Sequence, residues 1–311
     1  MFKKFFRDNK VHKKVVPFLD VIFLFKPVNM FIVWVFICVG MYLSSFYPSL
    51  FLQEINMSII DFHISTFLLF MGATILFGCI NISDESDDSF DISDKIKILL
   101  FIISFILLTG SNWRFFIVAS IIYILSGPFY KLDLLSISTK RLISNIIKCF
   151  LLILLGIIHS LASNAIQFIM SVDFFLLVMP YLLSYFSINL LYELSDSNNK
   201  SNTSIVSAEY RKKVLFSTIL IVFSLCLSLY LDDALLSSVL VVSIPFFLYA
   251  LIRGMKKDIE RVMKYPIAIL NIFVMFIYPV LFLIIFVTFY ISKYYYWHRL
   301  DTHYPTFLVD D

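Results

Sequence analysis

Carboxylates gather directly after a long apolar stretch that ends near residue 80. The uncharged run STFLLFMGATILFGCI is followed by NISDESDDSFDISDK, in which six of fifteen residues are acidic. Four oxygen-bearing residues in it are spaced i, i+3, i+4 and i+7: Asn81, Asp84, Glu85 and Asp88. A helix would present all four on one face. Such a face suits Mg²⁺, which binds one or two carboxylates and completes its shell with water and phosphate oxygens.

A second polar cluster, INLLYELSDSNNKSNTS, closes another apolar stretch at residues 188–204. The same helical spacing relates Asn189, Tyr192, Glu193 and Asp196. If both stretches end at one membrane face, their oxygens can meet, and a metal ion between them would offset the repulsion among the carboxylates. The predicted site therefore combines Asn81 and Asn189 with five metal ligands: Asp84, Glu85, Asp88, Glu193 and Asp196.

The elements that must position these residues are membrane helices. Of the 311 residues, 60% are hydrophobic and only 15% are charged, against about a quarter charged in soluble domains. Runs long enough to span a bilayer need roughly 20 residues. The short alternating segments of membrane β-barrels are lacking. We expect an all-α integral membrane protein, a single polytopic domain over 1–311 with about nine spans: 19–45, 59–82, 96–112, 113–127, 140–164, 168–194, 213–231, 234–253 and 265–292.

Orientation follows from the bias of Lys and Arg toward cytoplasmic loops. Twenty of the 25 Lys and Arg residues fall on the side of the N-terminus, three fall on the other side (Arg114, Lys293 and Arg299), and Lys26 and Lys148 lie within spans. This pattern predicts a cytoplasmic basic arm at 1–17 and an extracytoplasmic tail at 293–311, with YYYWH (294–298) as an outer aromatic belt. We expect a multi-pass protein of a bacterial inner membrane.

Other residue types point to no further chemistry. The four cysteines, Cys38, Cys79, Cys149 and Cys226, all lie in predicted spans without metal-type spacing, and the five histidines are scattered. The basic arm KKFFRDNKVHKK is explained by topology and by anionic lipid headgroups rather than by nucleic acid.

Four stretches resemble, in order along the chain, motifs of the UbiA superfamily of intramembrane prenyltransferases. LFKPVNMF is similar to the family's Arg-Pro entry to helix 1, with Lys26 in place of Arg. The cluster from Asn81 is a version of the family's first Asp-rich motif. YILSGPFYKLDLL carries Ser126, Pro128 and Lys131 at matching places, and SDSNNKSNTSIV resembles the second Asp-rich motif.

This resemblance implies nine transmembrane helices around a central cavity that is capped on the cytoplasmic side by the loops carrying the Asp-rich motifs. It also implies a chemistry in which Mg²⁺ helps a prenyl diphosphate to ionise and the allylic cation alkylates a lipophilic, often aromatic, acceptor. Basic groups would hold the diphosphate oxygens that the metal does not reach, and our candidates are Lys26, Lys131 and Lys200. The expected activity is therefore Mg²⁺-dependent prenyl transfer.

Departures from the motifs keep two alternatives open. Ile82 and Ser89 stand where the family has Asp, Glu85 replaces another Asp, and Tyr192 occupies the earlier Asp position of the second motif. A relative without activity could bind an isoprenoid lipid or a membrane partner. The same pocket could instead quench the cation internally, as in the terpene cyclases that this superfamily includes.

Overall fold

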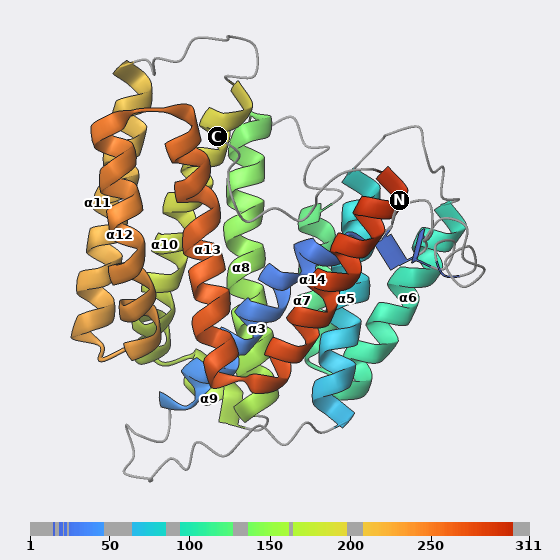
Figure 1. Ribbon diagram of the computed structural model, residues 1–311. Helices are drawn as coiled ribbons and strands as arrows, with labels where there is room; N and C mark the ends of the chain where they lie inside the picture. Colours follow the sequence, from blue (N-terminus) through green and yellow to red (C-terminus); the bar gives the residue numbers. More distant parts are fainter. Residues whose placement is uncertain are drawn as a thin grey trace. The chain divides into compact units, whose positions relative to one another are not determined.

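The computed structural model describes residues 15, 19–20, 22–23, 25–46, 64–84, 94–126, 136–161, 164–197 and 208–300 (Figure 1). Throughout these ranges the secondary structure is helical, without a strand. The described chain divides into two compact units. The expected all-α membrane class is confirmed, because six described helices are long and apolar enough to cross a membrane.

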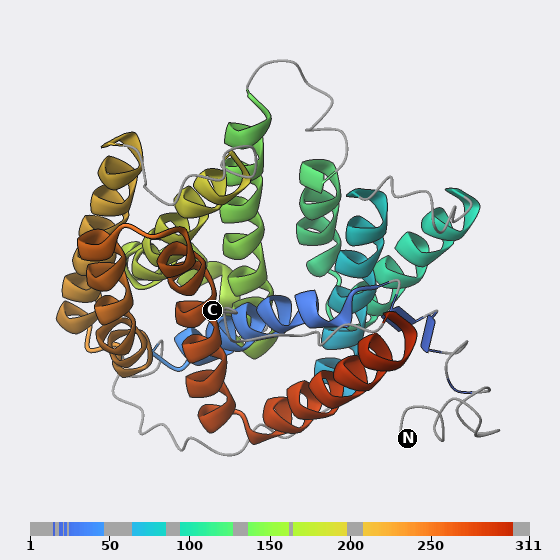
Figure 2. The ribbon, with the colours of Figure 1, turned by 45° about the horizontal axis from the view of Figure 1, so that its top comes forward.

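Unit 1 is built on an antiparallel pair of helices, α5 (Ile64–Asp84) and α6 (Asp94–Ser111), which lie side by side (Figure 2). Their polar contacts are two hydroxyl-to-carbonyl bonds of 2.8 Å, from Ser104 to Gly72 and from Ser111 to Ser65. Gly72 is required here, because a Cβ atom would lie only 2.8 Å from Leu108. After a tight turn at Asn112–Arg114, α7 (Phe115–Ser126) follows α6.

The N-terminal part of unit 1 packs on α14 (Pro279–Leu300). Phe23 stacks on Tyr295 with ring centroids 4.1 Å apart, and Leu19 completes this buried cluster. The Tyr295 hydroxyl donates a 2.7 Å hydrogen bond to Asp20, whose carboxylate also lies 3.3 Å from Arg299. The beginning of the described chain and the last turns of α14 are therefore held together.

Unit 2 contains most of α3 (Met30–Ser44) and six further helices: α8 (Ile137–Leu161), the short α9 (Ala165–Ile169), α10 (Val172–Ser197), α11 (Ala208–Tyr230), α12 (Ala234–Arg253) and α13 (Lys256–Ile277). Helices α10 to α13 each pack against the next (Figure 1). Two glycines let α3 and α8 touch through their backbones: a Cβ on Gly40 would collide with the carbonyl of Ile153, and one on Gly156 with that of Ile37.

Observed helices overlap eight of the nine predicted spans, although only six pass as full-length crossings by length and composition. The apolar parts of α5, α6 and α7 are shorter. The ninth prediction, one helix over 265–292, is wrong. The chain leaves α13 at Ile277 and starts α14 at Pro279, so the helix is interrupted at Tyr278 although the sequence stays apolar. Proline at the first helical position has no N–H to lose, which favours a new helix at that point.

The predicted placement of the two ends at opposite membrane faces stays a prediction, and one contact in unit 1 bears on it. Residues near 20 were expected at the cytoplasmic end of the first span and residues near 295 on the outer side. A hydrogen bond between Asp20 and Tyr295 cannot bridge a hydrocarbon core of about 30 Å. Tyr295 is also buried against Leu19 and Phe23, so it is not part of an outer belt that faces lipid.

Candidate functional site

Helix α10 is the element on which the candidate site is built, and α11 fixes its position. Ser187 and Ser217 are fully buried and form a reciprocal pair: their hydroxyl oxygens lie 2.6 Å apart, and each hydroxyl oxygen lies 2.9–3.0 Å from the other residue's carbonyl oxygen, so its one proton can go to either acceptor. Ser224 donates a 2.7 Å bond to the carbonyl of Pro180. Proline cannot donate in a helix interior, yet α10 continues to Ser197. Its register through Asn189, Glu193 and Asp196 is therefore helical, as predicted.

Asn189 is the one residue of the predicted site on this helix whose side chain the structure describes. It is 5% exposed, and its Nδ2 donates a 2.8 Å bond to the carbonyl of Tyr185. Its Oδ1 accepts a 3.0 Å bond from Nδ2 of Asn145 on α8. Because the carbonyl of Tyr185 must face an N–H, the orientation of both amides follows from the network. Asn189 is thus held in place, and its oxygen faces Asn145.

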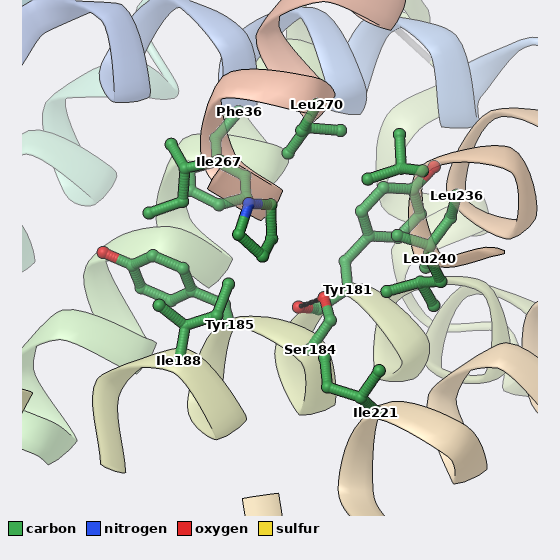
Figure 3. Close-up of a pocket in the computed structure, with 12 residues that line it drawn as sticks. Phe36, Tyr181, Ser184, Tyr185, Ile188, Ile221, Leu236, Leu240, Ile267 and Leu270 are labelled. Carbon is green, nitrogen blue, oxygen red and sulfur yellow. Dashed lines mark hydrogen bonds between the residues drawn. The ribbon is translucent and has the colours of Figure 1, made fainter. Parts of the chain in front are cut away.

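A pocket lies in unit 2 next to this polar chain, lined by residues of α3, α10, α11, α12 and α13 (Figure 3). Tyr181, Ser184, Tyr185 and Ile188 line it from α10, and Phe36 meets Tyr185 edge to face at 5.1 Å. The cavity volume is about 20 Å³, which is room for about one water molecule. A prenyl chain could enter only if these helices moved apart.

The acidic residues of the prediction fall at the margins of what the structure describes. Asn81 and Asp84 lie in the last turn of α5, and Glu193 and Asp196 in the last turns of α10, with the helical backbone described but not the side chains. Glu85 and Asp88 lie outside the described residues. The first cluster belongs to unit 1 and the second to unit 2. Whether the two clusters meet stays a prediction.

Of the three predicted diphosphate contacts, Lys131 and Lys200 lie outside the described residues. Lys26 is half-buried directly before the short 3-10 helix η1 (Pro27–Asn29), with φ 49° and ψ 65°. A left-handed backbone is uncommon for a residue with a Cβ atom, and such strained positions often occur at functional sites. On this geometry Lys26 remains a candidate diphosphate contact.

Sequence reasoning missed a buried carboxylate at the start of α12. Asp233 is 2% exposed, caps α12 by accepting a 3.1 Å bond from Leu236 N–H, and accepts a 3.2 Å bond from the Tyr42 hydroxyl. Its Oδ2 is buried without a hydrogen bond. Burial raises the pKa of Asp233, and the hydrogen bonds from the Leu236 N–H and the Tyr42 hydroxyl oppose that rise. An Asp just before an apolar run was a detectable capping signal.

Among the residues that the structure describes, no three His, Cys, Asp or Glu side chains gather as a metal site would require. Comparison with models of protein families, with curated proteins and with solved structures found no match. The functional argument therefore depends on this chain's own residues.

Proposed function

We propose that this membrane protein transfers a prenyl group from a polyprenyl diphosphate to a lipophilic, possibly aromatic, acceptor, and that the reaction depends on Mg²⁺. The observation that carries the proposal is the pair of oxygen-rich helix ends, Asn81–Asp84 on α5 and Asn189–Asp196 on α10, each with helical register in the backbone. The resemblance of four sequence stretches to the UbiA superfamily supports it. An all-α membrane protein is compatible with that chemistry.

The donor set suits Mg²⁺, a hard cation that prefers carboxylate oxygen. Its proposed ligands are Asp84, Glu85, Asp88, Glu193 and Asp196. When bound, the ion would neutralise charge on the leaving diphosphate. Asn189 fits less well as a ligand, because its oxygen accepts a bond from Asn145. We therefore assign Asn189 to fixing the end of α10.

The remaining roles fall to cations and aromatic rings. Lys26, Lys131 and Lys200 would bind the diphosphate oxygens by charge-assisted hydrogen bonds. As the allylic C–O bond breaks, ring faces such as those of Phe36 and Tyr185 would stabilise the carbocation. The acceptor carbon then attacks, and its proton leaves.

The test is turnover by the purified protein in lipid nanodiscs with labelled prenyl diphosphates and Mg²⁺. We expect diphosphate release that requires acceptor and stops with a chelator. Release from donor alone, with a cyclic product, would indicate a terpene cyclase. No release with any donor and acceptor pair would end the enzyme proposal.

A second candidate is a catalytically silent protein that binds an isoprenoid lipid or a membrane partner. The specific observation in its favour is the replacement of motif Asp residues by Ile82, Ser89 and Tyr192. It predicts that a prenyl diphosphate raises the melting temperature of the protein without being consumed.

For topology we propose that the N-terminal arm and the end of α14 both lie at the cytoplasmic face of a bacterial inner membrane. If α13 and α14 cross separately, the chain makes ten crossings instead of the nine typical of the family. Lys293 and Arg299 then join the basic side, and Arg114 alone remains outside, which strengthens the charge bias.

A further inference from the structure

Helix α8 carries a lysine deep inside an apolar stretch. Lys148 is the tenth of the 23 residues of the candidate span Thr139–Leu161, roughly 14 Å along the helix from its start. Its side chain is half-buried. Cations at this depth are rare, face a protein interior or a polar cavity, and often mark a ligand pathway. Lys148 also takes part in an interaction within the chain, so a ligand would join an existing polar network.

The contacts between α8 and α10 show which part of α10 lies nearest to Lys148. On α8, Lys148 lies between Asn145, which bonds Asn189, and Phe150, whose ring lies 6.0 Å from that of Phe174. The two helices are therefore antiparallel. On α10, the stretch between Phe174 and Asn189 supplies four pocket residues: Tyr181, Ser184, Tyr185 and Ile188. Asn145 thus lies opposite Asn189, one residue beyond Ile188 of the α10 wall, and Lys148 follows less than one turn further along α8. The residues that line the pocket itself come from other helices than α8.

Asn145 adds a second donor beside the ammonium group. It is three residues before Lys148, so the two side chains share a face of α8. An Asn side chain has two N–H groups, and the described contacts of Asn145 use one of them, in the bond to Asn189. The network that starts at the Tyr185 carbonyl holds the Asn145 amide in a fixed orientation. A fixed amide donor next to an ammonium is an arrangement that suits phosphate oxygens.

We propose that Lys148 and Asn145 bind a phosphate group of the isoprenoid diphosphate, one turn deeper than Asn189 from the acidic end of α10. This site rests on the proposed function for the identity of its ligand, but phosphate binding there does not require turnover. It adds a diphosphate contact on α8 to the three cations assigned from sequence. It also places the start of the prenyl chain next to Tyr185.

The experiment measures binding of inorganic pyrophosphate to the full-length protein in nanodiscs, in the presence of Mg²⁺, by isothermal titration calorimetry. Lys148→Gln should weaken binding about tenfold or more, as expected for the loss of a charge-assisted bond. Lys148→Arg should restore most of the affinity, and Asn145→Ala should weaken it several-fold. Lys293→Gln is the matched control, because it removes an exposed cation from α14, and it should leave the affinity unchanged.

Equal pyrophosphate affinity of wild type and Lys148→Gln would overturn the proposal, as would a wild type that binds no pyrophosphate at millimolar concentration. If Lys148→Gln does not fold, the comparison of Asn145→Ala and Lys148→Arg with wild type decides. A prenyl transfer assay on the same samples separates the two claims. Binding that depends on Lys148 without turnover supports this site and ends the enzyme proposal. Turnover that is unchanged in Lys148→Gln supports the enzyme proposal and overturns this site.

Discussion

The Tyr295 hydroxyl lies 2.7 Å from Oδ1 of Asp20, so residues 275 positions apart in sequence meet in unit 1. Phe23 stacks on the same tyrosine ring, and Arg299 lies beside the same carboxylate. A hydrogen bond, a ring stack and an ion pair therefore converge on a few residues. This contact holds the start of the described chain beside the last turns of α14.

The first prediction concerns topology. Reporter domains fused to the N-terminus and to the C-terminus should both report a cytoplasmic location, because the Asp20–Tyr295 contact places the last turns of α14 beside the start of the chain. A reporter inserted next to Arg114 should report the opposite side. Opposite locations for the two termini would contradict the contact and restore the placement predicted from sequence.

The second prediction concerns the crossing of α3 and α8. Gly40→Ala or Gly156→Ala should destabilise the protein by about 1–3 kcal/mol, because the new methyl group meets the backbone of the facing helix and not a movable side chain. Reversible unfolding in mixed micelles measures the loss.

Gly110→Ala is the matched control for this crossing. A Cβ atom there would lie 3.9 Å from Leu68, an ordinary van der Waals contact, and removing a glycine from a helix stabilises it by roughly 0.5–1 kcal/mol. Three alanine variants that behave alike would show that α3 and α8 are not in backbone contact.

Apolar runs predicted most helices, because a segment inside a membrane must form its backbone hydrogen bonds within itself and therefore folds as a helix. The same reasoning failed at one proline. Pro180 and Pro245 sit inside continuous helices, whereas Pro279 starts a new one. The missing N–H of Pro180 leaves the carbonyl of Leu176 without its usual helical donor, and α10 still continues. Whether a helix continues or restarts at a proline therefore depends on surroundings that hydropathy does not report.

The candidate site shows the same limit. Helical register on α10 was predictable from spacing, but the partner of Asn189 was not, because nothing in the sequence around Asn145 marks it as the residue that faces Asn189. Only the packing of α8 on α10 makes the two amides neighbours. The buried state of Asp233 likewise depends on Tyr42, 191 positions away. The residue types could be read from the sequence, but which distant residues pair with one another could not be predicted from it.

The third prediction tests the hydroxyl contacts between α10 and α11. Ser217→Ala should cost about 1 kcal/mol, the net value of a typical internal hydrogen bond, because its hydroxyl bonds both the side chain and the carbonyl of Ser187. Ser187→Ala should cost a similar amount, and the double variant should cost less than the sum, because each hydroxyl loses its partner only once. Ser237→Ala is the control, since its 3.4 Å bond is exposed and stays within one helical turn. Additive losses in the cycle would contradict the reciprocal pairing.

The fourth prediction uses the raised pKa of Asp233, which lies between α11 and α12. Burial makes the folded protein bind this proton more tightly than the unfolded chain does. The resulting stability is fully present below the unfolded pKa of about 3.9 and is lost as pH rises through the higher folded pKa. Asp233→Asn cannot titrate. The stability of wild type relative to Asp233→Asn should therefore increase as the pH is lowered from 7 toward about 4.

Variants that separate the hydrogen bonds of Asp233 from its charge serve as controls for the pH comparison. Asp233→Asn keeps an oxygen that can accept from Leu236 and Tyr42, so α12 should remain capped, whereas Asp233→Ala should lose about 0.5–2 kcal/mol at every pH through the missing cap. Tyr42→Phe removes one bond that favours the charged carboxylate, so it should raise the folded pKa of Asp233 further and widen the pH range of the effect. A stability difference between wild type and Asp233→Asn that is flat with pH, or that falls on acidification, would mean that this carboxylate is solvated and not buried.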